Sequence, residues 1–132
     1  MPQMANITVK AANGTTDAVY TAKVPSAGDK SPAIWKNDNV GNVLAAKPTL
    51  SVQSSSNGNR SSRRVKSKFT WPKQRVDAAG NTLVQGGAIL EVSALVPQDM
   101  TSAEIDEFVA QGLNLGASAL FKSMVRDGYS AV

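Results

Sequence analysis

Residues Thr49–Trp71 have the sequence TLSVQSSSNGNRSSRRVKSKFTW, whose alternating pattern is the main evidence for a β-sheet. In its second half, polar or charged side chains alternate with mostly apolar ones. The two sets are Arg64, Lys66, Lys68 and Thr70, and Val65, Ser67, Phe69 and Trp71. Because successive side chains of a β-strand point to opposite faces, this period predicts a strand with a positively charged face and an apolar face. The three cations Arg64, Lys66 and Lys68 are called the basic row below.

The basic row belongs to a predicted hairpin. Thr49–Gln53 also alternates between polar and apolar residues, which indicates a partner strand. Ser54–Ser62 is rich in serine, asparagine and glycine and predicts the loop between the two strands. The basic strand, Arg63–Trp71, is expected to stop at Pro72, because proline has no backbone N–H to donate to a sheet.

The N-terminal part of the chain predicts another hairpin, over residues 5–24. Ala5–Ala11 and Ala18–Val24 are both strand-like. Asn13 and Gly14, which lie between them, form one of the strongest turn signals known. The two strands are therefore expected to pair directly.

The remaining strands are expected to lie in a sheet that spans residues 33–97. A short strand, Ala33–Lys36, opens it and carries Trp35. Lys73–Gly87 is polar and predicts a long loop, of a kind that is often functional in small domains. Ala88–Val96 is apolar at nearly every position, which predicts a central strand covered on both faces.

After this point the hydrophobic period changes to that of helices, over residues 101–128. Thr101 and Glu104 form a capping-box pattern at a helix start. An apolar stripe with helical spacing follows, made of Ile105, Phe108, Val109, Gly112 and Leu113. Ser118 is a candidate cap for a second helix, which Asp127 and Gly128 end.

The order of the elements defines the expected fold class. Strands come first and helices last, which is typical of an α+β fold with an antiparallel sheet. The length of 132 residues fits one domain over residues 1–132.

Composition excludes several kinds of chemistry. The chain has no cysteine and no histidine, which removes disulfides, thiol nucleophiles and imidazole bases. No activated nucleophile or metal-ligand set is visible, so we expect no enzymatic activity, no cofactor and no small-molecule substrate. The first residues lack a signal-peptide pattern, and no stretch approaches the roughly 18 apolar residues of a membrane span. We expect a soluble protein without a membrane partner that works in the compartment where it is made.

The distribution of charge is more informative than the net charge of +4. From Glu91 onward acidic residues dominate, whereas the middle of the chain is basic. No acid lies between residues 39 and 76, a segment with the cations Lys47, Arg60, Arg63, Arg64, Lys66, Lys68, Lys73 and Arg75. Such a surface suits a polyanion, with RNA or DNA the usual candidate. The simpler alternative is a solvated strand edge whose lysines discourage aggregation.

The ordered set of these features resembles the coat proteins of single-stranded RNA bacteriophages, of levivirus type. The resemblance covers nearly the whole chain. It rests on Trp35 after the first hairpin, the strand pair TLSVQSSSNGNR and RRVKSKFTWP, the glycine-bearing segment after Pro72, and the helix TSAEIDEFVAQGL.

The resemblance implies a fold, a function and partners. Coat proteins of this family form an intertwined homodimer whose sheets join edge to edge, with the helices of each subunit over the partner's sheet. Dimers assemble in the host bacterial cytoplasm into an icosahedral shell, the virion, around genomic RNA. The inner sheet face also binds an RNA hairpin, which represses translation of the replicase gene. Segment 73–87 is implied to make contacts between subunits.

The resemblance also implies a set of RNA-binding residues. Thr49, Ser51 and Lys68 match an adenine-binding pocket, whereas Gly87 and Ile89 stand where a well-studied branch has a base-stacking tyrosine and an asparagine. Arg63 lies in the same cationic run and is added to the set. The candidate residues are Lys47, Thr49, Ser51, Gln53, Arg63, Arg64, Lys66, Lys68 and Thr70.

Two other kinds of protein fit the residues alone. One is a cellular RNA- or single-strand-binding module that does not assemble. The other is a structural surface or adhesion subunit that binds no polyanion.

Overall fold

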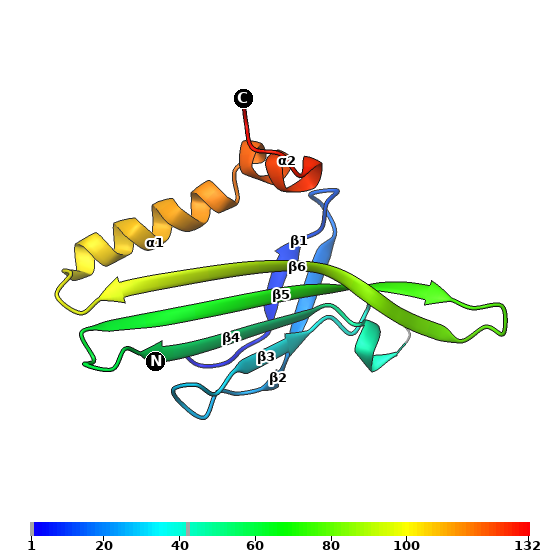
Figure 1. Cartoon of the computed structure of the whole chain (residues 1–132), viewed down its shortest axis with the longest axis horizontal. Coiled ribbons are helices and arrows are strands. Elements are labelled where there is room, and N and C mark those ends of the chain that lie inside the picture. The colour runs from blue at the N-terminus through cyan, green and yellow to red at the C-terminus, as the bar shows by residue number, and fades with distance from the viewer. Residues whose placement is uncertain (1, 42) are drawn as a thin grey trace. The chain divides into compact units, whose positions relative to one another are not determined.

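Six strands, neighbours in space in the order in which they occur in the sequence, form one antiparallel sheet in the computed structural model (Figure 1). The structure describes residues 2–41 and 43–132. The strands are β1 Ile7–Lys10, β2 Asp17–Val24, β3 Ala33–Lys36, β4 Thr49–Ser56, β5 Ser62–Val76 and β6 Thr82–Pro97. A 3-10 helix, η1 (Leu44–Ala46), precedes β4, and two α-helices, α1 (Ser102–Gly116) and α2 (Ala119–Asp127), follow β6. The predicted α+β class with an N-terminal hairpin, an antiparallel sheet and two C-terminal helices is confirmed.

The chain divides into two compact units, one running to Leu95 and one from Val96 to Val132. The single domain expected from the sequence stays a prediction.

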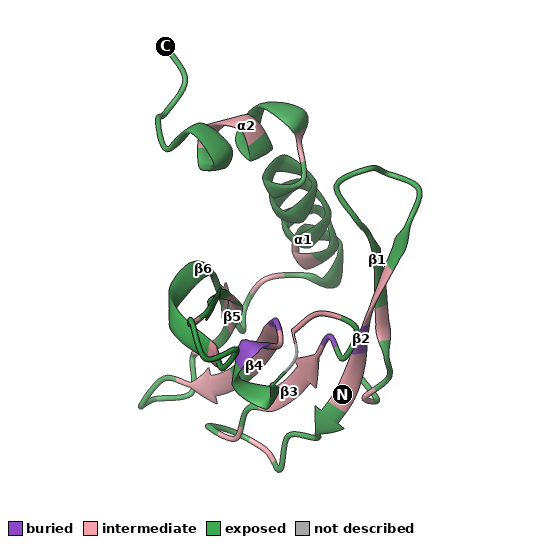
Figure 2. Ribbon diagram, turned by 90° about the vertical axis from the view of Figure 1, so that its right-hand side faces the viewer, coloured by how far each residue is buried: buried purple, intermediate pink, exposed green. Residues whose placement is uncertain are grey.

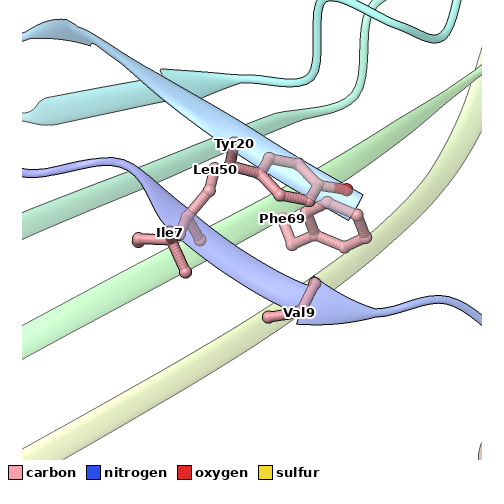
Figure 3. A pocket seen from close by; sticks show the side chains of 5 residues that line it. All are labelled: Ile7, Val9, Tyr20, Leu50 and Phe69. Carbon is pink, nitrogen blue, oxygen red and sulfur yellow. The ribbon is translucent and has the colours of Figure 1, made fainter. Parts of the chain in front are cut away.

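The core of the first unit lies on one face of the sheet. Tyr20 on β2 meets Phe69 on β5, with ring centroids 5.8 Å apart in an edge-to-face arrangement. In a flat sheet these strands, three spacings apart, would be separated by about 14 Å. The sheet is therefore curled around this aromatic pair, and Tyr20 is buried. An apolar pocket of about 230 Å³ remains beside it, lined by Ile7, Val9, Tyr20, Leu50 and Phe69 (Figure 3).

The prediction of a long loop over Lys73–Gly87 is wrong, because β5 continues to Val76 and β6 begins at Thr82. The strand does not stop at Pro72. The first residue of β4, Thr49, pairs with Thr70, so beyond Thr70 β4 leaves one side of β5 open. Proline is tolerated in that position, as it is in edge strands. The connection shrinks to a turn over residues 77–81.

Both β-hairpin turns of this region are shorter than expected. The loop predicted at Ser54–Ser62 covers only residues 57–61, since β4 and β5 extend into the serine-rich segment. In the turn after β5, the Asp77 carboxylate accepts hydrogen bonds from the backbone N–H groups of Ala79 and Asn81, at 3.0 and 2.8 Å. A short polar side chain thus closes this turn in the manner of an Asx turn.

The strand predicted as central and covered is at the edge of the sheet in the single chain. Among the described residues, β6 has only the strand β5 beside it, and most of its residues are exposed (Figure 2). Ile89 is 58% exposed and Leu95 49%. Apolar residues on both faces of a strand require cover, and the described part of one chain does not provide it.

The helices begin as the sequence predicts. The Thr101 hydroxyl accepts from the Glu104 N–H at 3.3 Å, and the Glu104 carboxylate accepts from the Thr101 N–H at 2.9 Å, so the capping box is complete. Ser118 caps α2. No described residue of α1 or α2 is buried, and Phe108 and Leu113 are 45% and 60% exposed. Neither helix is long and apolar enough to cross a membrane.

Gly87 marks a close approach between β5 and β6. Its φ of +148° is a backbone conformation that favours glycine. A Cβ at this position would lie 2.4 Å from the carbonyl oxygen of Trp71 and 2.9 Å from the Cα of Pro72. Both neighbours are backbone atoms, which cannot move away as a flexible side chain would.

We expect Gly87→Ala to lower the free energy of unfolding by roughly 1–3 kcal/mol, the usual cost of one strained backbone position. Denaturant unfolding of the purified protein measures this change. Gly58→Ala is the matched control, since a Cβ there meets nothing within 4 Å. Equal midpoints for the two variants would contradict the close approach.

Candidate nucleic-acid interface

The register between β4 and β5 places the basic row against hydroxyl and amide side chains. Lys68 pairs with Ser51, Lys66 with Gln53 and Arg64 with Ser55, and Thr70 pairs with Thr49. Directly paired residues of an antiparallel sheet point to the same face. All three cations are exposed. This face, with the basic row and its β4 partners, is called the basic face. The opposite face carries Leu50 and Phe69, which also pair with each other.

A third strand extends the basic face. Lys36 on β3 pairs with Thr49, and its Nζ donates a hydrogen bond to the Thr49 hydroxyl at 3.1 Å. Sequence reasoning missed Lys36. Lys36 follows Trp35 in the sequence and therefore points to the opposite face of β3. Only the register with β4 shows that it lies beside Thr49 on the basic face.

Lys47 lies at the margin of this face and already has a partner. Its Nζ is 3.0 Å from one carboxylate oxygen of Asp38, whose other oxygen is 2.7 Å from Lys23. Hydrogen bonds from Lys23 and then Lys47 lower the pKa of Asp38, because both stabilise its charged form. The carboxylate is thus shared between Lys23 and Lys47, and a ligand that binds Lys47 competes with it.

Arg63 is not on the basic face and leaves the candidate set. It pairs with Ser56, and adjacent strand residues point to opposite faces, so Arg63 lies on the other side from Arg64. Its guanidinium donates to Asp29 at 3.2 Å and to the Ser56 hydroxyl at 2.9 Å. The hydrogen bond from Arg63 lowers the pKa of Asp29, and the same contact raises the pKa of Arg63. Arg63 therefore links the segment after β2 to the end of the β4–β5 hairpin.

The cations of the basic row have no such neutralisation. Within residues 2–41 and 43–132, no carboxylate lies within salt-bridge distance of Arg64, Lys66 or Lys68. Neighbouring row positions are about 7 Å apart along the strand, where two unit charges repel by about 0.6 kcal/mol in water. A bound polyanion would remove this repulsion.

The hydroxyl and amide groups of the basic face differ in how far they are engaged. The Thr49 hydroxyl donates its proton to the Lys47 carbonyl at 3.0 Å and accepts from Lys36, so it has no proton left for a ligand. The Gln53 amide donates to the Lys30 carbonyl at 2.8 Å. Ser51 and Thr70 make no side-chain hydrogen bond to another described residue, which leaves both hydroxyls available.

The described residues contain no group of three or more Asp or Glu side chains that could hold a metal ion. The arrangement offers positive charge and hydroxyl groups on one face of the sheet, which suits binding of a polyanion.

The sheet with its N-terminal hairpin and two following helices is the coat-protein fold of single-stranded RNA phages. The chain is similar to the protein in the virus-like particle of bacteriophage NT-214, with a TM-score of 0.83, 18% identity, and 99% of this chain and 100% of that chain covered. For Beihai levi-like virus 21, also a virus-like particle, the TM-score is 0.82 at 20% identity, with 99% of each chain covered. For the capsid protein of bacteriophage GA, it is 0.70 at 13% identity, with 95% of each chain covered.

No protein-family model matches the sequence, and no curated protein matches it. At these identities the structural likeness establishes the fold, and the fold to which the sequence resemblance pointed is confirmed.

Proposed function

We propose that this chain is the coat protein of a single-stranded RNA bacteriophage, which dimerises, assembles into an icosahedral virion shell in the bacterial cytoplasm and packages genomic RNA on its basic face. The observation that carries the RNA part is the basic row itself. It has no neutralising carboxylate in the described part of the chain and stands opposite hydroxyl and amide groups. The protein has no enzymatic role in this proposal.

The position of the basic row argues against its being an edge-protection device. Charged residues, lysine above all, protect sheets where a strand is unpaired. β5 lies between β4 and β6, so Lys66 and Lys68 are on an interior strand. Their charges repel one another without protecting an edge, which favours a role in binding a polyanion.

The dimer part of the proposal rests on β6. This strand has 16 residues, and Glu91 is its single charged one. Long edge strands with so little charge tend to pair with another chain. A second copy of β6 gives such a pairing. In the intertwined dimer, helices of each subunit cover the apolar sheet face of the partner, which would bury residues such as Phe108 and Leu113.

RNA and shell formation support each other in this mechanism. Burial of apolar surface between subunits drives dimer formation. Each phosphate bound by the basic row releases condensed counterions, so RNA attracts many dimers and raises their local concentration. Packaging and assembly then occur together.

Repression of translation through an RNA hairpin is the finer part of the proposal. Ser51 and Lys68 pair directly, and Thr49 lies two residues from Ser51 on the same face, although the Thr49 hydroxyl is already engaged by Lys47 and Lys36. Gly87 carries no ring that could stack on a base. The basic face therefore supports RNA packaging more strongly than recognition of one sequence.

The turn over residues 77–81 is proposed to contact neighbouring dimers in the shell, in place of the longer segment 73–87. It closes a two-stranded part of the β5–β6 hairpin, beyond the end of β4. Asp77 fixes its backbone through the two hydrogen bonds described above.

A non-assembling RNA-binding module is the second candidate, and a structural subunit without a polyanion the third. Expression in a bacterium followed by size-exclusion chromatography separates the three. We expect particles in the megadalton range, on the order of a hundred or more copies, with an absorbance maximum near 260 nm from packaged RNA. A small RNA-binding dimer would favour the second candidate, and a protein-only assembly the third.

Replacement of both Lys66 and Lys68 by alanine is expected to weaken RNA binding and to flatten its dependence on salt. Loss of two phosphate contacts lowers the slope of log K against log salt concentration by about 1.4, at about 0.7 per contact for single strands. Filter binding of polyuridylate to disassembled dimers measures it. The matched control is the double variant Lys10→Ala and Lys122→Ala, which removes the same charge elsewhere. Equal slopes for the two double variants would contradict the role of the basic row.

Asp77→Ala is expected to leave dimers intact but to change the size or closure of the shell, because the turn loses the acceptor that holds its backbone. Electron microscopy measures the size and closure of the shell, and size exclusion shows whether dimers form. Asn13→Ala, which removes the comparable bonds to Thr15 and Thr16 in the N-terminal hairpin, is the control. Normal particles from Asp77→Ala would contradict the proposed contact between this turn and neighbouring dimers.

A further inference from the structure

Lys36 is a cation that the sequence resemblance did not assign. It lies on β3, in a line across the sheet with Thr21 on β2, Thr49 on β4 and Thr70 on β5. These paired positions share the face of the basic row. Thr70 is two residues beyond Lys68, so the line crosses β5 next to the end of the row.

The charge of Lys36 is not offset by a carboxylate. Among the described residues, its Nζ forms no ion pair, and its hydrogen-bond partner is the neutral Thr49 hydroxyl. Lys47, which the resemblance assigned, instead shares Asp38 with Lys23. A phosphate that binds Lys47 must compete with that carboxylate, whereas one that binds Lys36 does not.

The ammonium group of Lys36 is also held in place before any ligand arrives. Thr49 donates its only proton to the Lys47 carbonyl, so an oxygen lone pair faces Lys36. One of the three ammonium protons is used there, and two remain for a ligand. Because the side chain is half-buried, it has less rotamer freedom to lose on binding than a fully exposed lysine.

The basic row runs along β5, and the backbone of Lys36 lies about 10 Å to the side, two strand spacings away across β4. The ammonium group of Lys36 lies closer to the row, because it donates to Thr49 on β4, and Thr49 pairs with Thr70 on β5. A phosphate near Thr70, at the end of the row, is therefore within reach of Lys36.

We propose that Lys36 binds an RNA phosphate and extends the basic face to a third strand, and that it contributes more to RNA binding than Lys47. This inference rests on the proposed function and adds a residue to it. The ligand chemistry is the phosphodiester backbone of RNA, whose phosphates bind ammonium groups.

The test compares single variants in the polyuridylate filter-binding assay with disassembled dimers. Lys36→Ala is expected to lower the salt slope by about 0.7, the value for one phosphate contact, and Lys47→Ala by less than half of that. Lys122→Ala on α2 removes the same charge and is expected to leave the slope unchanged. Lys36→Arg keeps the charge and is expected to retain the slope.

Lys36→Gln guards against a folding defect, because its amide can still donate to Thr49 while the charge is lost. It is expected to behave like Lys36→Ala in binding and like the original protein in thermal unfolding. A wild-type slope for Lys36→Gln, or a larger loss for Lys47→Ala than for Lys36→Ala, would overturn the inference. If the Lys66 and Lys68 double variant still flattens the slope in that case, the proposed function stands; if it does not, both fail.

Discussion

The packing of Tyr20 against Phe69 inside the curled sheet fixes which residues of β5 face the core and which face outward. Phe69 sits between Lys68 and Thr70, so the strand pleat that turns its ring into the curl turns both neighbours outward on the other face. The edge-to-face contact with Tyr20, at 5.8 Å, fixes the orientation of β5 relative to β2. A shift of β5 by one residue would place lysines against the aromatic ring, at a large cost in desolvation. Packing on one face thereby holds the charges on the other.

The acidic residues near the basic face sharpen this arrangement. Asp38 engages two cations at its margin, and Asp29 engages Arg63 on the opposite face. Among the described residues, the cations of the basic face that have no acidic partner are therefore Lys36 on β3 and the basic row on β5. The lowered pKa values of both carboxyls follow from these contacts, and both groups therefore stay charged well into mildly acidic solution. The positive charge that a polyanion encounters therefore depends on where lysine and arginine lie and on which of them are paired with a carboxylate.

Local patterns predicted much of this molecule, and long-range geometry limited the rest. Alternation in Thr49–Trp71 and the capping box at Thr101 are local signals, and they located strands, faces and helix starts. The sequence prediction groups Arg63 with the basic row by its charge, whereas its position next to Arg64 in the strand puts it on the opposite face. Lys36 needed the register between β3 and β4, which no local pattern supplies. The polar segment after Pro72 was mistaken for a loop because an exposed two-stranded ribbon has no buried face to impose alternation.

The tight contact at Gly87 has a consequence for how this surface can diversify. The carbonyl of Trp71 occupies the space in which any side chain would begin, so an aromatic residue cannot be acquired there by a single codon change without remodelling both backbones. A descendant of this chain that recognised particular nucleobases would need its base-stacking aromatic residue at another position on the sheet.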